Sequence, residues 1–460
     1  MNERTRSLGE TAIGRLLIRL SLPAMVGMLV QASYNLVDAF FIGHGVGSLG
    51  LAATAVAFPF QLMIMAIATT GGVGAASIIS RNLGSGDIER ADRTLGTLIT
   101  TATVLGIVGA LLSWIYIEPL LRLLGATKDI FPYAEAYVSV VLFGIPLQVF
   151  GVGLNNAVRA EGNARIAMIT MFVSAVTNMI LDPLFIFTFK MGIAGAAWAT
   201  VIAQGAVVVW LLLYYLMGKS ALNLRPVHLI PRRDILGEML AVGSSEFARL
   251  SANSAIVALV VRSVGVYGGD MAIAAYGVVS RTLSLAFLPI FGIAQGMQPI
   301  LGYNYGARLY QRAHQVIRLS VAFASTWSFM AWVLVLLFPG PIFSFFTPDA
   351  DLQVLGARSM RYMTFGFCLV GFQVMGSALF QALGKARPAF FLSLSRQVLL
   401  FLPLLYFLPP FLGLMGVWLS FPAADVLSAL MTLYFFRRQM KQLEACDGRL
   451  PSLSADNLTE

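Results

Sequence analysis

The stretch RNLGSGDIERA, residues 81–91, has a second version in the same chain, YNYGARLYQRA, residues 303–313. The alignment pairs Asn82 with Asn304, which are 222 residues apart. Two further loops repeat with the same offset, since FGIPLQV and RAEGNAR within residues 143–165 match FGFCLVG and QALGKAR within residues 365–387. One offset that holds through all three matched segments predicts two parallel structural repeats, related by an axis along the membrane normal.

The composition identifies the environment of these repeats. Of 460 residues, 58% are hydrophobic and 12% are charged, whereas a soluble domain has about a quarter charged residues. Apolar stretches long enough to cross a bilayer recur along the chain, which indicates an all-α, multi-span membrane protein. The formal net charge of +9 comes from basic residues in the loops, where they set the orientation of the helices in the membrane. No nucleic-acid partner is therefore expected.

Apolar length and polar breaks predict twelve transmembrane helices. The first six cover 13–43, 49–80, 94–117, 130–151, 165–188 and 192–217, and the second six cover 235–264, 271–302, 314–338, 352–380, 387–411 and 414–437. The predicted regions are a cytoplasmic N-terminus (1–12), an N-lobe (13–217), a cytoplasmic linker (218–234), a C-lobe (235–437) and a disordered cytoplasmic tail (438–460). Basic clusters follow every even crossing, so both termini are expected in the cytoplasm. No cleaved signal peptide is expected, and two cysteines cannot form a disulfide framework.

Two aspartates interrupt the apolar helices of the first repeat. Asp38 lies in YNLVDAFFIG, four residues after Tyr34, and Asp182 lies in TNMILDPLFIF, four residues after Asn178. Residues four apart share one helix face, so each pair points the same way. A charge within a membrane span is costly unless it has a partner or lines water, and this makes both aspartates candidates for function. Alternatively, Asp38 snorkels to the interface and Asp182 caps a helix end.

Depth in the membrane brings further polar residues to the same level. At a rise of 1.5 Å per residue, Thr200 and Tyr137 lie within about one helical turn of the level of Asp38 and Asp182. The 222-residue offset places Val260 opposite Asp38, and the second repeat has no carboxylate at either position. Because a purely architectural residue should recur in both repeats, this asymmetry favours a functional site.

These motifs resemble those of the multidrug and toxic compound extrusion (MATE) transporters, in particular the DinF-like branch and its small bacterial multidrug pumps. YNLVDAFFIG, TNMILDPLFIF, MGIAGAAWAT and GMQPILGYNYGARLYQRA carry the resemblance, which covers roughly residues 13–437. It implies two pseudo-symmetric six-helix lobes around a central V-shaped cleft in a bacterial inner membrane. It further implies export of amphipathic, usually cationic compounds, antibiotics among them, in exchange for H⁺ or Na⁺.

The resemblance also assigns residues. The cation or proton site of the DinF-like branch matches Asp38, Tyr34, Asn178, Asp182, Thr200 and Tyr137, and its helix-bending proline matches Pro23. If the ion is Na⁺, Asp38, Asn178, Asp182 and Thr200 are the expected ligands. Substrate contacts are expected at Gln31, Asn155, Asn156, Met171 and Phe172. Two carboxylates at one depth cannot comfortably both be ionised, so the pair is expected to take up a proton.

Protonation is expected to let the first helix bend at Pro23, which lacks a backbone N–H, and so to expel the substrate from the N-lobe. The partners are then amphipathic or cationic drugs, H⁺ or Na⁺ and lipids, with no cofactor and a monomeric chain. In the C-lobe, Glu246 with Arg249 is interpreted as a structural pair, and Asp425 is expected to pair with a basic residue.

Other functions are less well supported. The sequence GKS at residues 218–220 lacks the upstream glycine of a phosphate loop, and three scattered histidines have no metal-ligand spacing, so no enzyme is expected. Asp38 and Asp182 could be imagined as an intramembrane aspartyl protease pair, but their Thr, Tyr and Asn neighbours suit cation binding better. A lipid-linked-precursor flippase is the remaining alternative. It would use arginines inside the cavity, for which the candidates are Arg249, Arg262, Arg281, Arg358 and Arg361.

Overall fold

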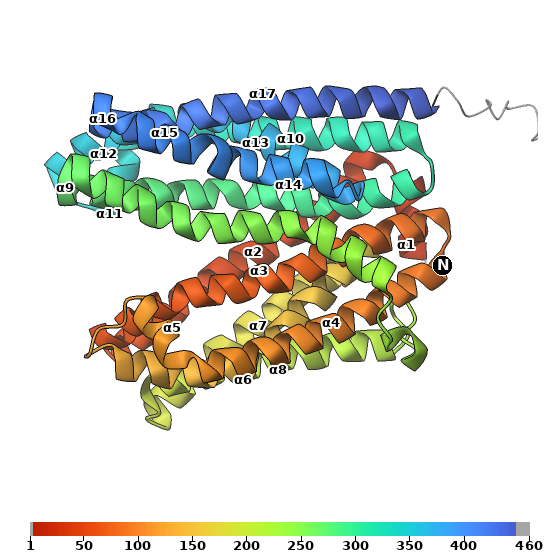
Figure 1. Cartoon of the computed structure of the whole chain (residues 1–460), viewed down its shortest axis with the longest axis horizontal. Helices are drawn as coiled ribbons and strands as arrows, with labels where there is room; N and C mark the ends of the chain where they lie inside the picture. The colour runs from red at the N-terminus through yellow and green to blue at the C-terminus, as the bar shows by residue number, and fades with distance from the viewer. Residues whose placement is uncertain (1–2, 448–460) are drawn as a thin grey trace, which may run out of the picture.

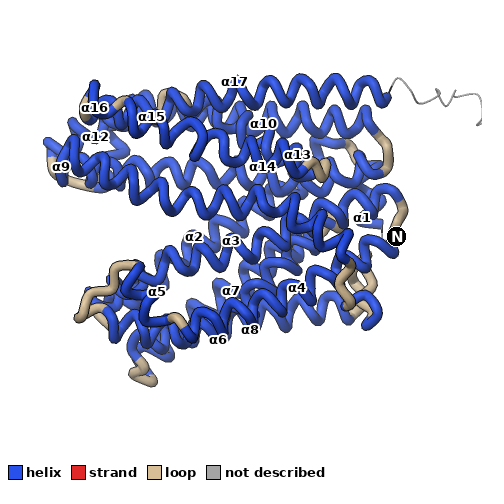
Figure 2. Tube along the Cα trace, viewed as in Figure 1, coloured by secondary structure: helices blue, strands red, loops and turns tan. Residues whose placement is uncertain are grey.

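The computed structural model describes residues 3–447, which form helices joined by turns and loops with no strand among them (Figure 2). The first half comprises α1 (Glu3–Glu10), α2 (Ile13–Gly45), α3 (Ser48–Ser85), α4 (Ile88–Ile115), α5 (Ile117–Leu123), α6 (Phe131–Ala160), α7 (Ala164–Pro183), the π-helix η1 (Leu184–Thr188), α8 (Gly192–Leu216) and the 3₁₀-helix η2 (Pro226–Leu229). The second half comprises α9 (Arg233–Gly306), α10 (Tyr310–Leu337), α11 (Pro339–Phe346), α12 (Ala350–Met363), η3 (Phe367–Leu369), α13 (Val370–Ala382), α14 (Ala386–Leu394), the π-helix η4 (Ser395–Phe401), α15 (Leu402–Phe407), α16 (Pro409–Leu412) and α17 (Leu414–Asp447).

Ten described helices are long and apolar enough to cross a membrane, and the bent pair α12 and α13 makes an eleventh span. Helix α9 is in fact two helices that meet at Gly269, where φ is 66° and ψ is −167°. Glycine adopts this left-handed backbone conformation without a Cβ penalty. Counted as two spans, α9 brings the described chain to twelve crossings, and the all-α multi-span fold is confirmed.

Several predicted helices differ from those observed, and α6, for example, continues to Ala160 where the prediction ended at residue 151. Helix α4 begins before residue 94 because the Asp87 side chain caps it by accepting from the backbone N–H of Arg90. The span predicted at 352–380 is not one straight helix, since α12 and α13 are bent by 43° where Gly366 packs against Pro422 and Asp425 of α17. The span at 387–411 contains the π-helix η4.

The predicted disorder of 438–460 is wrong for residues 438–447. These residues continue α17, with Met440 and Leu443 buried. The Lys385 ammonium donates to Gln439 at 2.6 Å and to Gln442 at 2.9 Å, which fixes the end of the helix to the loop before α14. Residues 448–460 lie outside the described part of the chain.

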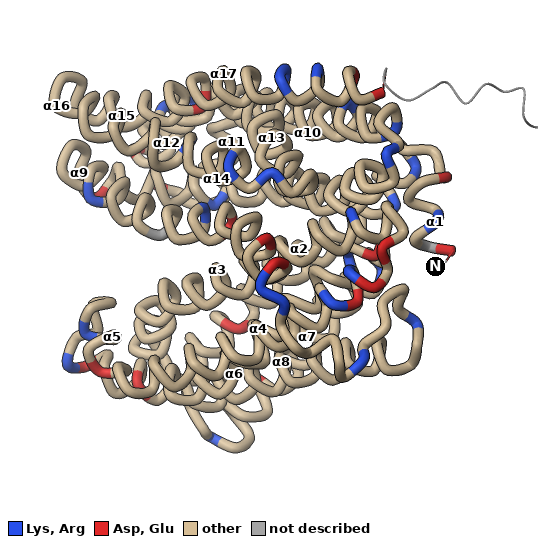
Figure 3. Tube along the Cα trace, turned by 45° about the vertical axis from the view of Figure 1, so that its right-hand side comes forward, with Lys and Arg blue, Asp and Glu red and all other residues tan. Residues whose placement is uncertain are grey.

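The two halves form two helical lobes that meet around α1 and diverge toward the end that carries α5 and α16 (Figure 1). Acidic and basic residues gather beside α1, at the end where the lobes meet (Figure 3). There, α3 of the first lobe packs directly on α9 of the second. A Cβ at Gly84 would overlap the carbonyl oxygen of Tyr303, and a Cβ at Gly306 would overlap the carbonyl oxygen of Arg81.

This contact repeats the sequence offset in space. Gly84 matches Gly306 and Arg81 matches Tyr303, so each lobe presents to the other the same glycine against the same backbone position. Small residues that let helix backbones approach closely are typical of packing within membranes. The pseudo-symmetric lobes predicted from the repeat are therefore present, and they are joined by a reciprocal interface.

Candidate functional site

Four helices of the first lobe, α2, α6, α7 and α8, bring the predicted polar residues together. Asn178 and Asp182 share one face of α7, and the Asn178 amide donates to Asp182 Oδ1 at 3.3 Å. The same amide donates to Thr200 Oγ1 of α8 at 3.4 Å, while the Thr200 hydroxyl donates to the carbonyl of Ala196 at 3.1 Å. Asn178 thus connects α7 to α8 and holds the Asp182 carboxyl in place.

Helix α2 supplies the second carboxyl. Asp38 is half-buried, Asp182 is fully buried, and their carboxyl groups lie within hydrogen-bonding reach of each other. Within residues 3–447, neither aspartate forms an ion pair with a lysine, arginine or histidine. Two facing carboxyls with no basic partner must share a proton or hold a cation, because two buried like charges repel each other strongly.

The site has oxygens available for such a ligand. Asp38 Oδ1, Asn178 Oδ1 and Asp182 Oδ2 are all buried, and none has a hydrogen-bond partner among the described residues. A buried acceptor without a partner costs about 1–3 kcal/mol, so three of them in one place indicate a site that is filled during function. Carboxylate and amide oxygens suit either a proton or a hard cation such as Na⁺.

Two tyrosines border the carboxyl pair. Tyr34, one turn before Asp38 on α2, lies close to both aspartates and to Gln31. Tyr137 of α6 is buried and interacts with the same aspartates, and its hydroxyl accepts a hydrogen bond from Gln61 of α3 at 3.1 Å. The structure therefore brings all six predicted cation-site residues to one place.

Gln61 is a site residue that sequence reasoning missed. It is a polar residue within the apolar run AVAFPFQLMIMAI of α3. The criterion that selected Asp38, a polar group within a membrane span, would have selected Gln61 as well. Its signal in the sequence is weaker, because a neutral amide is less costly in a membrane than a carboxylate.

The backbone after Asp182 is also unusual. Pro183 ends α7, and the chain continues directly into the π-helix η1. Single π turns within helices are rare and occur frequently at functional sites. The loss of the Pro183 N–H removes one backbone hydrogen bond beside the buried carboxyl, so the wider turn begins where the regular helix is already interrupted.

Pro23 lies where α2 changes its packing partner. Before and just after Pro23, Ser21 and Met25 pack against Gly296 and Gly292 of α9, in the other lobe. Further along, Gly27 packs against Met171 of α7. Helix α2 remains continuous through the proline. A bend at Pro23 would therefore move the Asp38 half of α2 while the first half stays on α9.

The predicted substrate residues fall into two groups. Gln31 contacts Tyr34 at the carboxyl site, Met171 packs on Gly27, and Phe172 is exposed on α7. Asn155 and Asn156 lie at the end of α6, where Asn156 accepts from Arg159. Arg159 also donates to Gln295 of α9 at 2.6 Å, so Asn156 is connected through Arg159 to the other lobe, and neither asparagine is gathered at the carboxyl site.

The second lobe pairs its carboxylates with arginines. Arg396 Nε donates to Asp425 Oδ1 at 2.6 Å, which identifies the basic partner expected for Asp425. Arg249 donates to Glu246 at 2.6 Å, as expected for a structural pair, and Gln381 donates to the other Glu246 oxygen at 2.9 Å. Arg396 itself could not be selected from sequence, because it lies on η4, whose register is set by the wider π turn.

The remaining flippase candidates do not form one cationic cavity with Arg249. Arg262, Arg281, Arg358 and Arg361 are exposed, and the Arg358 guanidinium lies over the ring of Tyr362 at 6.0 Å. Arg249 is held by Glu246, so its charge is balanced. This arrangement does not favour the flippase alternative.

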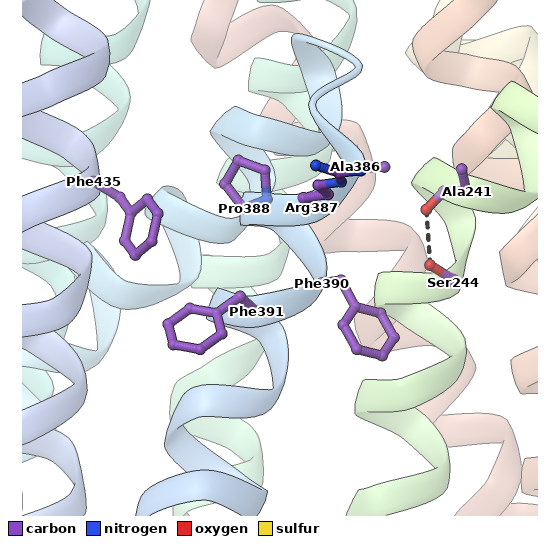
Figure 4. A pocket seen from close by; sticks show the side chains of 8 residues that line it. All are labelled: Ala241, Ser244, Ala386, Arg387, Pro388, Phe390, Phe391 and Phe435. Carbon is purple, nitrogen blue, oxygen red and sulfur yellow. Dashed lines mark hydrogen bonds between the residues drawn. The ribbon is translucent and has the colours of Figure 1, made fainter.

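A cavity of about 610 Å³ opens elsewhere, between α9, α14 and α17 (Figure 4). Aromatic side chains dominate its wall, with Phe390, Phe391 and Phe435 beside Pro388 and Arg387. None of the predicted site residues lines it. This apolar cavity is therefore separate from the carboxyl site.

A two-lobed helical membrane protein with an unneutralised carboxyl pair inside one lobe has the form of a secondary transporter. The sequence profile of the MatE family matches residues 23–184 and 249–407, one segment in each lobe. The chain belongs to this family of MATE efflux transporters, which are not enzymes.

Individual relatives align over nearly the whole length. The multidrug export protein MepA of Staphylococcus aureus (strain MSSA476) is 25% identical over 434 residues, which is 94% of this chain and 96% of that one. The FAD transporter of Shewanella oneidensis is 28% identical over 438 residues, with the same coverage. The structure of the MATE multidrug transporter DinF-BH in complex with R6G is 40% identical with a TM-score of 0.87, and covers 93% of this chain and 96% of that one. A crystal structure of MATE in the bent conformation, 26% identical, has a TM-score of 0.92 and covers 97% of this chain and all of that one.

Proposed function

We propose that this protein is a proton-coupled multidrug exporter of the DinF-like branch, which exchanges amphipathic, mostly cationic compounds for protons. The identity to DinF-BH and the alignment with MepA support the branch and the substrate class. The acidic N-lobe site also suits a cationic substrate better than the substrate of the relative that is an FAD transporter. The chain acts as a monomer in a bacterial inner membrane.

The observation that carries the proposal is the pair of facing carboxyls, Asp38 and Asp182, with no basic partner in the described chain. Such a pair can release a proton where the proton concentration is low and take one up where it is high. A cationic drug can occupy the same lobe when the proton has left, because the negative charge then needs a partner. Proton and drug would thus compete for the negative charge of the carboxyl pair. Binding of one lowers the affinity for the other, which is what exchange requires.

Helix α2 is the part that moves in this proposal. Protonation of the pair removes the charge that attracts the drug, and α2 bends at Pro23, beyond which its packing passes from α9 to α7. The shift moves Tyr34 and Asp38 toward α7 and closes the space that the drug occupied. Gln31, Met171 and Phe172 would contact the drug before this happens, and Asn155 and Asn156 would contact it on its way between the lobes.

The direction of transport follows from the proposed topology. Both termini and the end with α1 face the cytoplasm, where the basic residues gather. A membrane potential supplies about 2.3 kcal/mol per charge per 100 mV, and a pH difference about 1.4 kcal/mol per unit. Together these support an export gradient of roughly several hundredfold for one proton exchanged with a neutral drug.

Sodium is the second candidate for the coupling ion. The three unpartnered oxygens at Asp38, Asn178 and Asp182, with the Thr200 hydroxyl next to them, could coordinate Na⁺ as well as accept a proton. Residue roles and fold would be the same in both cases. Only the ion that drives transport would differ.

The test is transport of a fluorescent cationic dye, such as rhodamine 6G, into inverted vesicles under an imposed pH gradient. We expect the wild-type protein to accumulate dye and Asp38→Asn to bind dye without accumulating it. Asp87→Asn, which changes a loop aspartate, is the matched control and should transport normally. Accumulation driven by a Na⁺ gradient alone would mean that Na⁺, and not H⁺, is the coupling ion. Full activity of Asp38→Asn would overturn the proposed site.

A further inference from the structure

The second lobe contains a continuous row of arginine and phenylalanine side chains that the proposed export mechanism does not use. The Arg249 guanidinium lies 5.1 Å from the ring centre of Phe291, and the rings of Phe291 and Phe287 stack with centres 5.9 Å apart. The Arg396 guanidinium lies 5.6 Å from the ring centre of Phe287. Two cations therefore border one aromatic surface on α9.

Each arginine side chain is more exposed than the carboxylate with which it pairs. The side chains of Arg249 and Arg396 are both 29% exposed, whereas Glu246 is 15% and Asp425 is 4% exposed. Both arginine side chains are therefore partly accessible next to the rings of Phe287 and Phe291.

Both guanidiniums have hydrogen-bond donors left over. Arg396 uses Nε for Asp425, and no acceptor among the described side chains bonds to its Nη1 or Nη2. Arg249 uses Nε and Nη2 for Glu246 and has Nη1 unused in the same part of the chain. Guanidinium offers five N–H donors in a planar fork, so one carboxylate on one edge leaves room for a second on another edge.

A neighbouring amide links the two elements that carry the arginines. Gln397 donates to Asn253 Oδ1 of α9 at 3.4 Å, but its own Oε1 is buried and has no partner among the described residues. Gln397 follows Arg396 on η4, and Asn253 lies one turn after Arg249. This polar contact therefore bridges η4 and α9 between the two arginines.

We propose that Arg249, Phe287, Phe291 and Arg396 form a second substrate subsite that binds the aromatic carboxylate part of amphipathic substrates. The ring system of the substrate would stack on the phenylalanines, and its carboxylate would accept hydrogen bonds from the unused guanidinium N–H groups. The acidic N-lobe site would repel such a group, so the two lobes together accommodate zwitterions as well as cations. This inference rests on the proposed export function and extends its substrate class.

The test compares two dyes that differ only in this group: rhodamine B, which has a free carboxylate, and its ethyl ester. Binding of each dye to the purified full-length protein is measured by fluorescence, and the result is the ratio of the two Kd values. Because both dyes are measured on one preparation, partial unfolding lowers both signals alike and leaves the ratio unchanged. We expect the wild-type protein to favour the carboxylate.

The variants remove charge in balanced pairs, so that no buried carboxylate is left alone. The double substitutions Arg396→Gln with Asp425→Asn, and Arg249→Gln with Glu246→Gln, should each weaken rhodamine B binding about tenfold, the typical effect of losing a hydrogen bond to a charged group. Binding of the ester should change less than about twofold. Asp87→Asn, at the N-cap of α4, is the matched control outside both sites and should leave the preference for the carboxylate in place.

Two outcomes would overturn the subsite. One is a wild-type protein that binds both dyes equally, and the other is a pair of double variants that lower both affinities alike. Export of the ester under a pH gradient is measured in parallel. If the ester is exported while the preference is absent, the proposed function holds and only the subsite fails.

Discussion

The two lobes share a fold and a repeat but treat buried carboxylates in opposite ways. In the N-lobe, Asp38 and Asp182 face each other and have no basic partner within residues 3–447. In the C-lobe, Asp425 and Glu246 each hold an arginine at 2.6 Å. The same architecture therefore carries one unbalanced site and one balanced site.

This difference predicts that the two lobes contribute differently to the stability of the protein and to the coupling of transport to the ion. A buried carboxylate with an arginine is a closed electrostatic unit, and removing one partner leaves the other as an uncompensated charge. A carboxyl pair without a counter-ion is already strained, so its charge is available to a proton or a substrate. Substitutions in the C-lobe should thus affect folding first, and substitutions in the N-lobe should affect transport first.

The largest expected effect on stability is that of Asp425→Asn. It leaves Arg396, whose side chain is 29% exposed, without its carboxylate, and losing this hydrogen bond to a charged group costs about 2–3 kcal/mol. The matched N-lobe variant, Asp182→Asn, removes a charge that has no counter-ion, so its thermal stability should equal or exceed that of the wild type. The measurement is the apparent unfolding midpoint of each purified protein in the same detergent.

A further variant makes this comparison sharper. Arg396→Gln combined with Asp425→Asn removes both charges, and its midpoint should return most of the way to the wild-type value. Equal destabilisation by Asp182→Asn and Asp425→Asn would contradict the distinction between the lobes. Transport by Asp182→Asn should still be lost, because the proton pair is gone.

A smaller effect on stability is expected at the interface between the lobes, where the two lobes make matching contacts. Gly84→Ala and Gly306→Ala each place a methyl group against a backbone carbonyl of the opposite lobe, that of Tyr303 or of Arg81. Overpacking of this kind costs about 1–3 kcal/mol, and the pseudo-symmetry predicts similar values for the two variants. Thermal unfolding of both proteins side by side is the measurement. As a control, Gly237→Ala on α9 meets no neighbouring atom and should have little effect.

Unequal losses of stability in Gly84→Ala and Gly306→Ala would show that the two matching contacts do not contribute equally to the stability of the protein. The packing of the helices would then differ between the lobes, as the buried carboxylates do. Equal losses would place the difference between the lobes in their buried charges alone.

Much of this organisation could be predicted from sequence because it depends on regular geometry. Apolar length sets the spans, and a fixed rise per residue places Asp38, Asp182 and Thr200 at one level. The 222-residue offset shows that the second repeat lacks the two carboxylates, so they are not part of the architecture that both repeats share. The contacts of Asn178 with Asp182 and Thr200 then follow from helix faces that the spacing already defined.

The parts that could not be predicted depend on local irregularity. The π-helices η1 and η4 and the 43° bend between α12 and α13 arise from packing against other helices. Arg396 lies on such a segment, so the partner of Asp425 could not be identified from helical spacing. The helical end of α17 was missed for a similar reason, since its polar surface is anchored by Lys385 from a distant loop.

The smallest effect concerns the one site residue that sequence reasoning passed over. Gln61 donates to the hydroxyl of buried Tyr137 at 3.1 Å, which leaves that hydroxyl proton free to turn toward the carboxyl pair. The C-lobe has no carboxyl pair that would need such a support. Gln61 is therefore expected to position Tyr137 and so to tune the N-lobe site.

Gln61→Leu and Tyr137→Phe, singly and together, test this role. A single hydrogen bond contributes about 0.5–1.5 kcal/mol, and the double-mutant cycle should return a coupling energy of that size in thermal unfolding. Both single variants should also shift the pH at which dye export is half-maximal in the same direction, because each removes the same contact from the carboxyl pair. A coupling energy near zero, or an unchanged pH profile in Gln61→Leu, would mean that Gln61 only fills space between α3 and α6.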